Sequence, residues 1–468
     1  MNTPLSDNID KATHKPSQDK VKTIVLFSNS GDDALAVLRV IGPAINSGMN
    51  VIRGEINGLI LFDRILEGDI VVLQRDFSRD LDLYEKIIKF AHDQRKPVVL
   101  DLDDLLLELP ENHPDRISNF FTESLLPMLQ AIMEVDLVTV ATNAIQDYLL
   151  QYNRNVKVFQ NYLNDQLWKI IEPVSNRSGD SPITIGYMGG HSHKPDIQMV
   201  TPILLHLLHK YSDNIVFKFW GIEPPDELVH FSQVDWCPPK SYTYADFVSY
   251  FQTQSADIMI APLIDNLFNS CKSAIKFLEY SALGVPGVYS KISPYEITVE
   301  DGVDGLLASS PLEWEASLSK LIEDQEFRRR IALNAQAKIR KSWLLSQNAY
   351  KLKQIYEDLA NSFPAQEHHL SPFYLLVKSL TRQVFDGIRF KKQQLADSTN
   401  RIIILQNEIT TLGDLNVQKE QQLDRSNEQI QNLLNRVNES EEEIVSYVMS
   451  TSWQITRPLR KVSRKLKK

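Results

Sequence analysis

Short apolar runs alternate with longer amphipathic stretches along most of this chain, and this alternation constrains the fold more than any other feature. The apolar runs form two groups. The first comprises Thr23–Phe27, Asn50–Arg53, Ile70–Gln74, Val98–Asp101, Leu137–Ala141 and Val156–Phe159. The second comprises Thr184–Met188, Val216–Trp220, Val234–Cys237, Ile258–Ala261, Pro286–Ser290 and Gly305–Ala308. Runs that are apolar throughout are typical of parallel strands that helices cover on both faces.

The two groups predict two α/β domains of similar size, each Rossmann-like, with a ligand cleft between them. We expect the first domain over residues 22–165 and the second over 183–362, including a return helix. Residues 166–182 are rich in Pro, Ser, Asn and Gly near their end, which favours a linker. Residues 1–21 are polar and are expected to be disordered, and 363–387 are expected to form a second linker.

Composition excludes several classes of function. The chain has 60 acidic and 50 basic residues, a net charge of −10, whereas nucleic-acid-binding domains are usually basic. Its two cysteines, Cys237 and Cys271, are too few for a disulfide framework or a cysteine zinc site. Neither a signal-peptide core nor an apolar run of ~18 residues is evident. We therefore expect a cytoplasmic protein whose contact with a membrane is at most peripheral.

Residues 388–448 carry a seven-residue apolar repeat that predicts a coiled coil. An Asn at a core position, Asn416, favours a parallel two-stranded homodimer. The alternative is a single amphipathic helix that folds against the globular part. The repeat includes Ile388, Leu395, Ile402, Leu405, Ile409, Leu412, Leu423, Ile430, Leu433, Val437 and Ile444.

The last segment, 449–468, is basic and amphipathic. Between Trp453 and Lys468 it has seven Lys and Arg side chains and no acid. Such a tail suits an anionic membrane surface, here the inner face of the membrane. The alternative is a solvated tail without a partner.

The stretch that follows Ile258–Ala261 has the features of an anion site. A helix is expected to begin near Ser273 and to stop at Gly284. Its amino end offers free N–H groups, and Lys272 and Lys276 add positive charge, which suits a diphosphate. Glu279, farther along, would accept hydrogen bonds from sugar hydroxyls. Taken as a bare pattern, a surface helix with two solvated lysines explains the same residues.

This stretch resembles the second domain of retaining GT-B glycosyltransferases of family 4. Gly284-Val285-Pro286 and the segment from Asp301 to Leu307 match that family, and Glu279 matches its second conserved glutamate, which holds the nucleotide ribose. Lys276 to Tyr280 fits the Lys-x-x-Glu-Tyr pattern of a subset of that family. The family's first glutamate, which contacts the donor sugar, is replaced here by Cys271.

A glycine-rich turn at Gly189-Gly190 is similar to the turn that opens the donor-binding domain in this family. Glycine there lets the backbone approach a phosphate. The resemblance implies that His193 and Lys194 also belong to the donor site. The alternatives for the two neighbouring histidines, His191 and His193, are an exposed loop or an incomplete metal site.

Two further segments resemble bacterial polysaccharide glycosyltransferases. Asp101, Asp103 and Asp104 follow their Asp-x-Asp-Asp pattern, for which we favour a structural or acceptor-side role. Asn161 lies where the chain leaves the first domain. The ending from Thr451 to Arg460 resembles the end of many envelope glycosyltransferases that carry a coiled coil.

Together these resemblances imply a retaining, metal-independent glycosyltransferase. It would move a sugar from a nucleotide-sugar, its co-substrate, to a cell-surface glycan or lipid-linked acceptor, with 22–165 as acceptor domain. The predicted donor-binding residues are Gly189, Gly190, His193, Lys194, Lys272, Ser273, Lys276 and Glu279, with no metal ligand and no assigned catalytic base. The alternatives are a non-catalytic adaptor that organises a polysaccharide-synthesis complex through its coiled coil, and a sugar-nucleotide epimerase.

Overall fold

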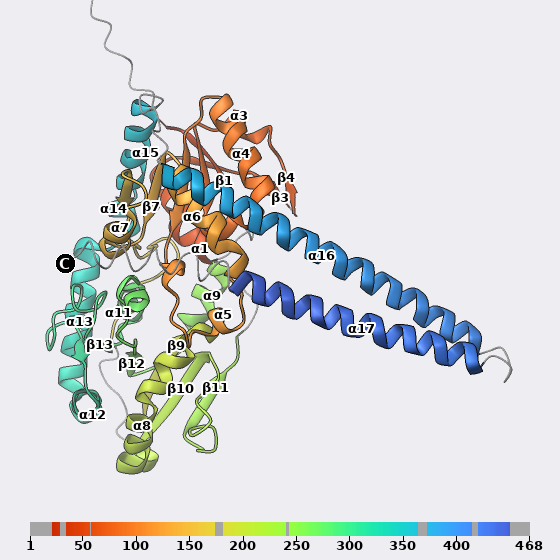
Figure 1. Ribbon diagram of the computed structural model, residues 1–468. Coiled ribbons are helices and arrows are strands. Elements are labelled where there is room, and N and C mark those ends of the chain that lie inside the picture. Colours follow the sequence, from red (N-terminus) through yellow and green to blue (C-terminus); the bar gives the residue numbers. More distant parts are fainter. Residues whose placement is uncertain are drawn as a thin grey trace, which may run out of the picture.

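The computed structural model describes residues 21–28, 34–56, 58–173, 181–239, 243–363, 372–413 and 420–449. These residues form two α/β domains and a long helical hairpin that projects from them (Figure 1). Several expectations lie outside the described residues: the disordered N-terminus up to 20, most of the loop at 173–182, Asn416, and the basic tail beyond 449.

The first domain is built on a six-stranded parallel sheet in the order β2-β1-β5-β6-β7-β8. The strands fall on the six predicted runs within a residue or so. They are β1 (Thr23–Phe27), β2 (Asn50–Arg53), β5 (Ile70–Gln74), β6 (Val98–Leu102), β7 (Leu137–Val140) and β8 (Val156–Val158). A small antiparallel hairpin, β3 (Glu55–Ile56) with β4 (Leu59–Ile60), was not predicted.

Helices cover both faces of this sheet. The helical segment at 34–46 contains a π-helical turn, Val37–Ile41. Side-chain oxygens cap two others, because Asp80 accepts from the Leu83 N–H and Thr142 from the Ile145 N–H. The helices are α1 (Ala34–Ala36), α2 (Gly42–Asn46), α3 (Arg64–Glu67), α4 (Leu81–Asp93), α5 (Pro114–Ile117), α6 (Leu125–Glu134) and α7 (Asn143–Leu149).

The second domain has another six-stranded parallel sheet, in the order β11-β10-β9-β12-β13-β14. The chain therefore reverses its direction of travel across the sheet between β9 and β12, and such a reversal is where doubly wound sheets bind ligands. The strands are β9 (Ile183–Gly189), β10 (Ile215–Gly221), β11 (Val234–Cys237), β12 (Ile258–Ala261), β13 (Gly287–Ser290) and β14 (Leu306–Ala308).

The helices of the second half end on the first domain. Leu352 and Tyr356 of the last of them, α15, are buried in one cluster with Ile24 and Val72 of the first sheet. This return ties the two domains together. The helices are α8 (Lys194–Tyr211), α9 (Tyr244–Phe251), α10 (Leu267–Ser270), α11 (Ile275–Ala282), α12 (Pro311–Glu323), α13 (Gln325–Ser342), α14 (Leu345–Asn348) and α15 (Tyr350–Ser362).

The apolar repeat forms a hairpin within one chain rather than one continuous coiled coil. Helix α16 (Pro372–Gly413) and helix α17 (Glu420–Val448) run antiparallel and side by side (Figure 1). Ile402 and Leu405 pack against Ile430 and Leu433, so the core residues of the repeat contact each other intramolecularly. The repeat expected to form one coiled-coil helix over 388–448 is divided between two helices, α16 and α17.

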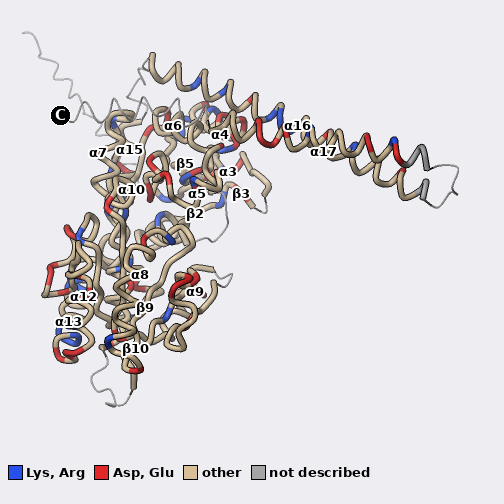
Figure 2. Tube along the Cα trace, turned by 60° about the horizontal axis from the view of Figure 1, so that its bottom comes forward, with Lys and Arg blue, Asp and Glu red and all other residues tan. Residues whose placement is uncertain are grey.

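The root of the hairpin rests on the first domain. Val384 and Ile388 share a buried cluster with Leu126 of α6 and Val448 of α17. Helix α16 begins at Pro372, so the linker expected up to 387 is helical over its second half. Beyond the root, both helices carry basic and acidic residues (Figure 2). Within the described ranges, no helix combines the length and apolar character needed to cross a membrane.

Candidate functional site

The carboxyl ends of β9 and β12 meet where the second sheet reverses, and the loops that follow them form one polar site. Asp196, in the first turn of α8, ties the two loops together. Its Oδ1 accepts hydrogen bonds from the Ile264 N–H at 2.9 Å and from Asn269 Nδ2 at 3.0 Å. Two loops far apart in the sequence thus have a fixed geometry.

Asp196 also orients His193. Its Oδ2 lies 2.8 Å from His193 Nδ1. Burial and the charge of Lys276 lower the pKa of His193 to about 4, so the imidazole is neutral at neutral pH. Burial acts to raise the pKa of Asp196, but the hydrogen bonds from His193 and Ile264 lower it overall. The carboxylate therefore accepts from Nδ1–H, which leaves Nε2 of His193 as a free acceptor.

Lys276 is the most unusual residue of the site. Its side chain is 8% exposed, and its Nζ has no hydrogen-bond partner among the described residues. Nζ lies 4.8 Å from the ring centroid of Tyr187, whose hydroxyl is also buried without a partner. Burial lowers the pKa of Lys276 to about 8. A buried ammonium group without a partner is costly, so its presence points to an anionic ligand.

Glu279 lies one turn farther along α11 and is 5% exposed. Burial raises the pKa of its carboxyl to about 8, so it is largely protonated at neutral pH. Glu279 also faces Tyr244 of α9, whose pKa is raised by burial and then by the nearby Glu279. A neutral carboxyl in this position can both donate and accept hydrogen bonds.

Ser273 lies just before the helix rather than inside it. Helix α11 begins at Ile275, with Ala274 at its N-cap, so it starts two residues later than expected. The end agrees with expectation, because Gly284 has a φ of +72°. Ser273 Oγ accepts a hydrogen bond from Asn161 Nδ2 of the first domain at 2.8 Å. The site thus includes a contact across the domain boundary.

The two glycines of the turn, Gly189 and Gly190, have different surroundings. A Cβ on Gly189 would come within 2.6 Å of the Tyr187 hydroxyl, whereas a Cβ on Gly190 would meet nothing within 4 Å. Gly189 is therefore needed for packing, and Gly190 leaves open space at the carboxyl end of β9. Lys194 is exposed on the first turn of α8 and makes no ion pair with any described residue. Its place in the donor site stays a prediction.

An aromatic cavity of about 210 Å³ adjoins the glycine turn, and sequence reasoning missed it. Its floor includes Phe247 and Phe251, whose rings stack at 5.6 Å. These residues lie one turn apart on α9, and that spacing is the signal that could have indicated an aromatic face. The lining comprises Met188, Gly189, Gly190, Trp220, Gly221, Cys237, Pro238, Pro239, Phe247, Tyr250 and Phe251.

The three aspartates of the acidic segment, Asp101, Asp103 and Asp104, have different roles. Asp101 stabilises the first domain, whereas Asp103 and Asp104 face the cleft. Asp101 is buried, and its carboxylate pairs with Arg39 at 2.8 Å. Asp103 and Asp104 instead face Arg75, at 3.7 and 3.9 Å. In the part of the chain that the structure describes, no three His, Cys, Asp or Glu side chains are grouped to hold a metal ion.

Asp104 connects the acidic segment to the second domain. Its carboxylate lies 3.8 Å from the Lys272 ammonium, which also sits 4.4 Å from the ring centroid of Phe268. Burial acts to raise the pKa of Asp104, but the charges of Lys272 and Arg75 lower it overall. Burial raises the pKa of Asp103 to about 6. One lysine of the site is thus paired with an acid of the opposite domain.

The cleft is closed in this structure. A cavity of about 20 Å³ lies between His113 of the first domain and His193 and Lys272 of the second. That volume holds about one water molecule. Cys271 is fully buried among apolar residues of the first domain, and its carbonyl accepts from Thr142 Oγ1 at 2.8 Å. The position that aligns with the family's sugar-contacting glutamate is therefore an apolar interdomain contact.

Solved structures with the same fold support this architecture. Sucrose-phosphate synthase from Thermosynechococcus elongatus superposes with a TM-score of 0.52 at 13% identity, covering 73% of this chain and 100% of that one. HepE from Anabaena, in complex with UDP and glucose, gives 0.51 at 15% identity, covering 72% and 100%. The chain thus has the GT-B fold. No family model and no curated protein matches the sequence.

Proposed function

We propose that this protein is a glycosyltransferase that uses a nucleotide-sugar donor. The observation that carries the proposal is Lys276, a buried ammonium group at the point where the second sheet reverses, for which the described residues supply no hydrogen-bond partner. A diphosphate is the ligand class that best satisfies it, because a second lysine, Lys272, and the open Gly190 backbone lie on the same loops.

The remaining parts of the site fit the rest of such a donor. The aromatic cavity beside Gly190 would hold the base between Trp220 and the α9 rings. Glu279, one turn from Lys276 on α11, would bind the ribose hydroxyls. The Nε2 of His193 would accept a hydrogen bond from a hydroxyl of the transferred sugar.

Chemically, the site would stabilise the leaving group. The bond between the anomeric carbon and the diphosphate breaks, and its electron pair stays on the diphosphate. An acceptor hydroxyl oxygen forms the new bond to the anomeric carbon, and its proton passes to the departing diphosphate. Lys272, Lys276 and the backbone N–H groups near Ser273 and Gly190 would neutralise the developing charge. We extend the proposal to a retaining, metal-independent reaction, which the sequence resemblance supports.

Substrate entry requires the domains to separate. The cavity of about 20 Å³ between His113 and His193 is far smaller than a sugar ring. The polar contacts that close the cleft include the hydrogen bonds of Asn161 with Ser273 and of Thr142 with Cys271, and the Asp104–Lys272 ion pair. Phe268 and Cys271 add apolar contacts with the core of the first domain. We propose that donor and acceptor bind to an open form and that closure then excludes water.

For the acceptor we propose a cell-surface glycan or a lipid-linked sugar, bound on the first domain at the inner face of the membrane. The Asp103–Asp104 pair and the ending that resembles envelope glycosyltransferases support this assignment. Contact of the 449–468 tail with anionic lipid remains a prediction about residues that are almost all outside the described part.

An adaptor role is the second candidate. The outer face of α16 exposes Phe390, Ile403 and Ile404, which a binding partner could cover. In that case the hairpin, rather than the cleft, would carry the function.

Nucleotide release from a panel of UDP-, GDP- and dTDP-sugars separates the two candidates. UDP-sugars come first, because HepE was solved with UDP and glucose. We expect turnover of one donor with extracted envelope glycolipids, and a loss of at least about a hundredfold in Lys276→Met and Glu279→Ala. Lys320→Met removes a lysine on α12, outside the cleft, and should leave turnover unchanged. No release and no donor binding by calorimetry would contradict the transferase proposal and favour the adaptor.

A further inference from the structure

The Asp104 carboxylate lies between two cations that belong to different domains. Its Oδ1 lies 3.8 Å from the Lys272 ammonium of the second domain, and its Oδ2 lies 3.9 Å from the Arg75 guanidinium of the first. Both distances exceed that of a hydrogen bond, so either ion pair can be exchanged without the loss of a hydrogen bond. Asp104 thus shares its charge between the proposed donor site and its own domain.

Asp104 needs at least one of these two cations. Its side chain is 22% exposed, and burial acts to raise its pKa, whereas the charges of Lys272 and Arg75 lower it. The imidazoles of His113 and His193 also face it, but burial lowers the pKa of both, so they are neutral at neutral pH. A largely buried carboxylate that lost its last cation would be strongly destabilised.

Arg75 can hold this charge in addition to the one that it already faces. Its Nε lies 3.7 Å from Asp103 Oδ1, and neither of these two atoms has a hydrogen-bond partner among the described residues. The guanidinium lies 5.2 Å from the ring centroid of Phe121, which helps to orient it. Because a guanidinium has five N–H donors, Arg75 can face Asp103 and still pair with Asp104.

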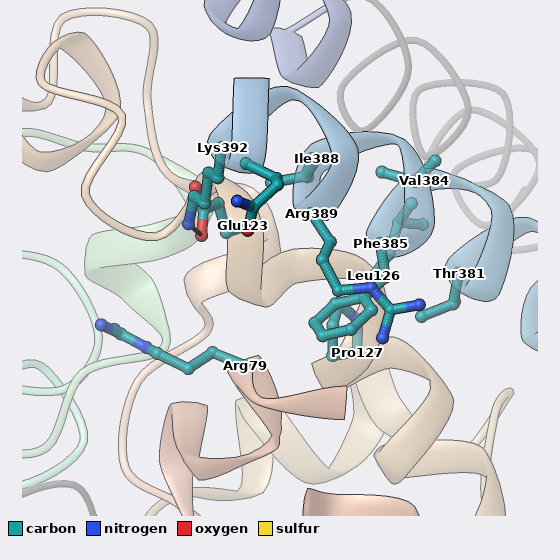
Figure 3. Close-up of a pocket in the computed structure, with 11 residues that line it drawn as sticks. Arg79, Glu123, Leu126, Pro127, Thr381, Val384, Phe385, Ile388, Arg389 and Lys392 are labelled. Carbon is teal, nitrogen blue, oxygen red and sulfur yellow. Dashed lines mark hydrogen bonds and ion pairs between the residues drawn. The ribbon is translucent and has the colours of Figure 1, made fainter. Parts of the chain in front are cut away.

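The backbone holds Arg75 at this place in an unfavourable conformation. Its φ of +53° lies in the left-handed region, which is strained for a residue with a Cβ. Arg75 directly follows β5, at the carboxyl edge of the first sheet. Arg79, at the other end of the same 3-10 segment, instead pairs with Asp76 and lines a cavity at the root of the hairpin (Figure 3). Arg75 is therefore the arginine of this segment that faces the cleft.

We propose that Arg75 is a positioning residue for the donor, because it remains the partner of Asp104 when a diphosphate binds Lys272. Lys272 exchanges the Asp104 carboxylate for the diphosphate, and Asp104 keeps its pair with Arg75. Without Arg75, the same exchange leaves a largely buried carboxylate unpaired beside an anionic ligand, which opposes closure of the domains over the donor. This inference rests on the proposed function, since it requires that Lys272 binds a diphosphate.

A double-mutant cycle with UDP as the probe tests the exchange. Calorimetry gives the dissociation constant of UDP for the unmodified full-length protein, for Arg75→Gln, for Asp104→Asn and for the double variant. We expect Arg75→Gln to weaken UDP binding at least about fivefold in the presence of Asp104, and less than about twofold in the Asp104→Asn background. If Arg75 acted only as a distant positive charge, the factor would be the same in both backgrounds, and that result would overturn the proposal.

Two single variants serve as controls. Arg75→Lys keeps a positive charge, and it should bind UDP within about twofold of the unmodified protein, because neither ion pair is a bidentate hydrogen bond. Arg95→Gln removes an exposed arginine that also has a left-handed φ, +54°, but follows α4 at the opposite edge of the sheet. It should leave UDP binding unchanged. A loss in Arg75→Lys as large as that in Arg75→Gln would show that the charge of Arg75 is not what matters.

Failure of this inference can be distinguished from failure of the proposed function. If the unmodified protein binds none of UDP, GDP and dTDP, the proposed donor site is wrong and the exchange is wrong with it. If UDP binds and the cycle is additive, the donor site stands and the exchange is excluded. The Arg75 side chain is 27% exposed, so we expect Arg75→Gln to fold, and thermal unfolding of each variant checks this. If Arg75→Gln does not fold, Arg75→Ser takes its place in the cycle.

Discussion

Asn161 of the first domain donates a hydrogen bond from Nδ2 to Ser273 Oγ of the second, at 2.8 Å. The Oδ1 of the same amide accepts from buried Arg39, whose guanidinium pairs with Asp101. The residue that precedes the proposed phosphate-binding helix is thereby connected to the core of the opposite domain. The arrangement gives the closed state a polar contact that depends on both domains.

A double-mutant cycle measures this contact. Asn161→Ala and Ser273→Ala should each destabilise the protein, and their coupling energy should be about 0.5–1.5 kcal/mol, the usual net value of a hydrogen bond. Urea unfolding of the two single variants and the double variant gives the value. Thr142→Val removes a separate interdomain hydrogen bond. The effects of Asn161→Ala and Thr142→Val on the free energy of unfolding should therefore be additive. Zero coupling between Asn161 and Ser273 would show that the bond does not form in solution.

Removal of the Asp104 charge should strengthen donor binding. In the closed state the Asp104 carboxylate is ion-paired with the Lys272 ammonium. Asp104→Asn removes this pair and makes the ammonium available to the diphosphate. We expect UDP to bind a few-fold more tightly at low salt, with a smaller gain at high salt because screening weakens the original pair. Calorimetry at two ionic strengths provides the measurement, with Asp213→Asn, on the far side of the second domain, as control. Weaker UDP binding in Asp104→Asn would contradict the inference that Asp104 and the diphosphate compete for Lys272.

Donor affinity should fall as the pH rises through about 8. Lys276, with its pKa lowered to about 8, loses its charge over this range, and Glu279, with its pKa raised to about 8, becomes negative. Both changes disfavour a diphosphate. From about pH 7 to about pH 9 the loss of the Lys276 charge alone predicts about tenfold weaker binding of UDP.

The two contributions can be separated by calorimetry as a function of pH. Glu279→Gln cannot ionise, so it should retain the part of the decline that Lys276 causes. Lys276→Met should bind UDP weakly at every pH and should lack the part of the decline in affinity that Lys276 causes. An affinity that is constant over this range in the unmodified protein would exclude Lys276 as a diphosphate ligand.

The antiparallel hairpin makes a prediction that a parallel dimer does not. Leu405→Asp places a charge in the seam between α16 and α17. We expect hydrogen exchange over 420–448 to accelerate at least about tenfold, with little change in the main thermal transition, because the two domains have separate cores. Gln406→Asp, on the exposed face of the same helix, should leave exchange unchanged. If sedimentation experiments show a dimer that Leu405→Asp dissociates, the helices pair between two chains rather than within one.

The strands could be predicted almost residue by residue because their signal is local. A run such as Ile70–Gln74, apolar on both faces, has few alternatives to a buried parallel strand, and two sets of such runs require two sheets. The pairing of those strands is not local. The resemblance assigned His193 and Lys276 to one donor site, but only the fold shows that the strands before them, β9 and β12, are neighbours.

The apolar repeat shows the same difference between local signals and non-local contacts. The seven-residue spacing determined that α16 and α17 would be helices with a continuous apolar stripe. Spacing carries no information about whether the stripe meets another chain or the same chain after a reversal, because both bury the same side chains. Gly413 was the available signal, and a glycine alone does not distinguish a break from a tolerated residue.

By itself, then, the sequence determined the two α/β domains, the helical repeat and most of the charged residues of the proposed donor site. The tertiary structure decided which of these charges are free and which are paired. Lys276 and Lys272 look alike in the sequence, yet one is buried without a hydrogen-bond partner and the other faces Asp104. The physical reason is that desolvation and Coulomb energies depend on distances between residues remote in the chain, and only the closed fold fixes those distances.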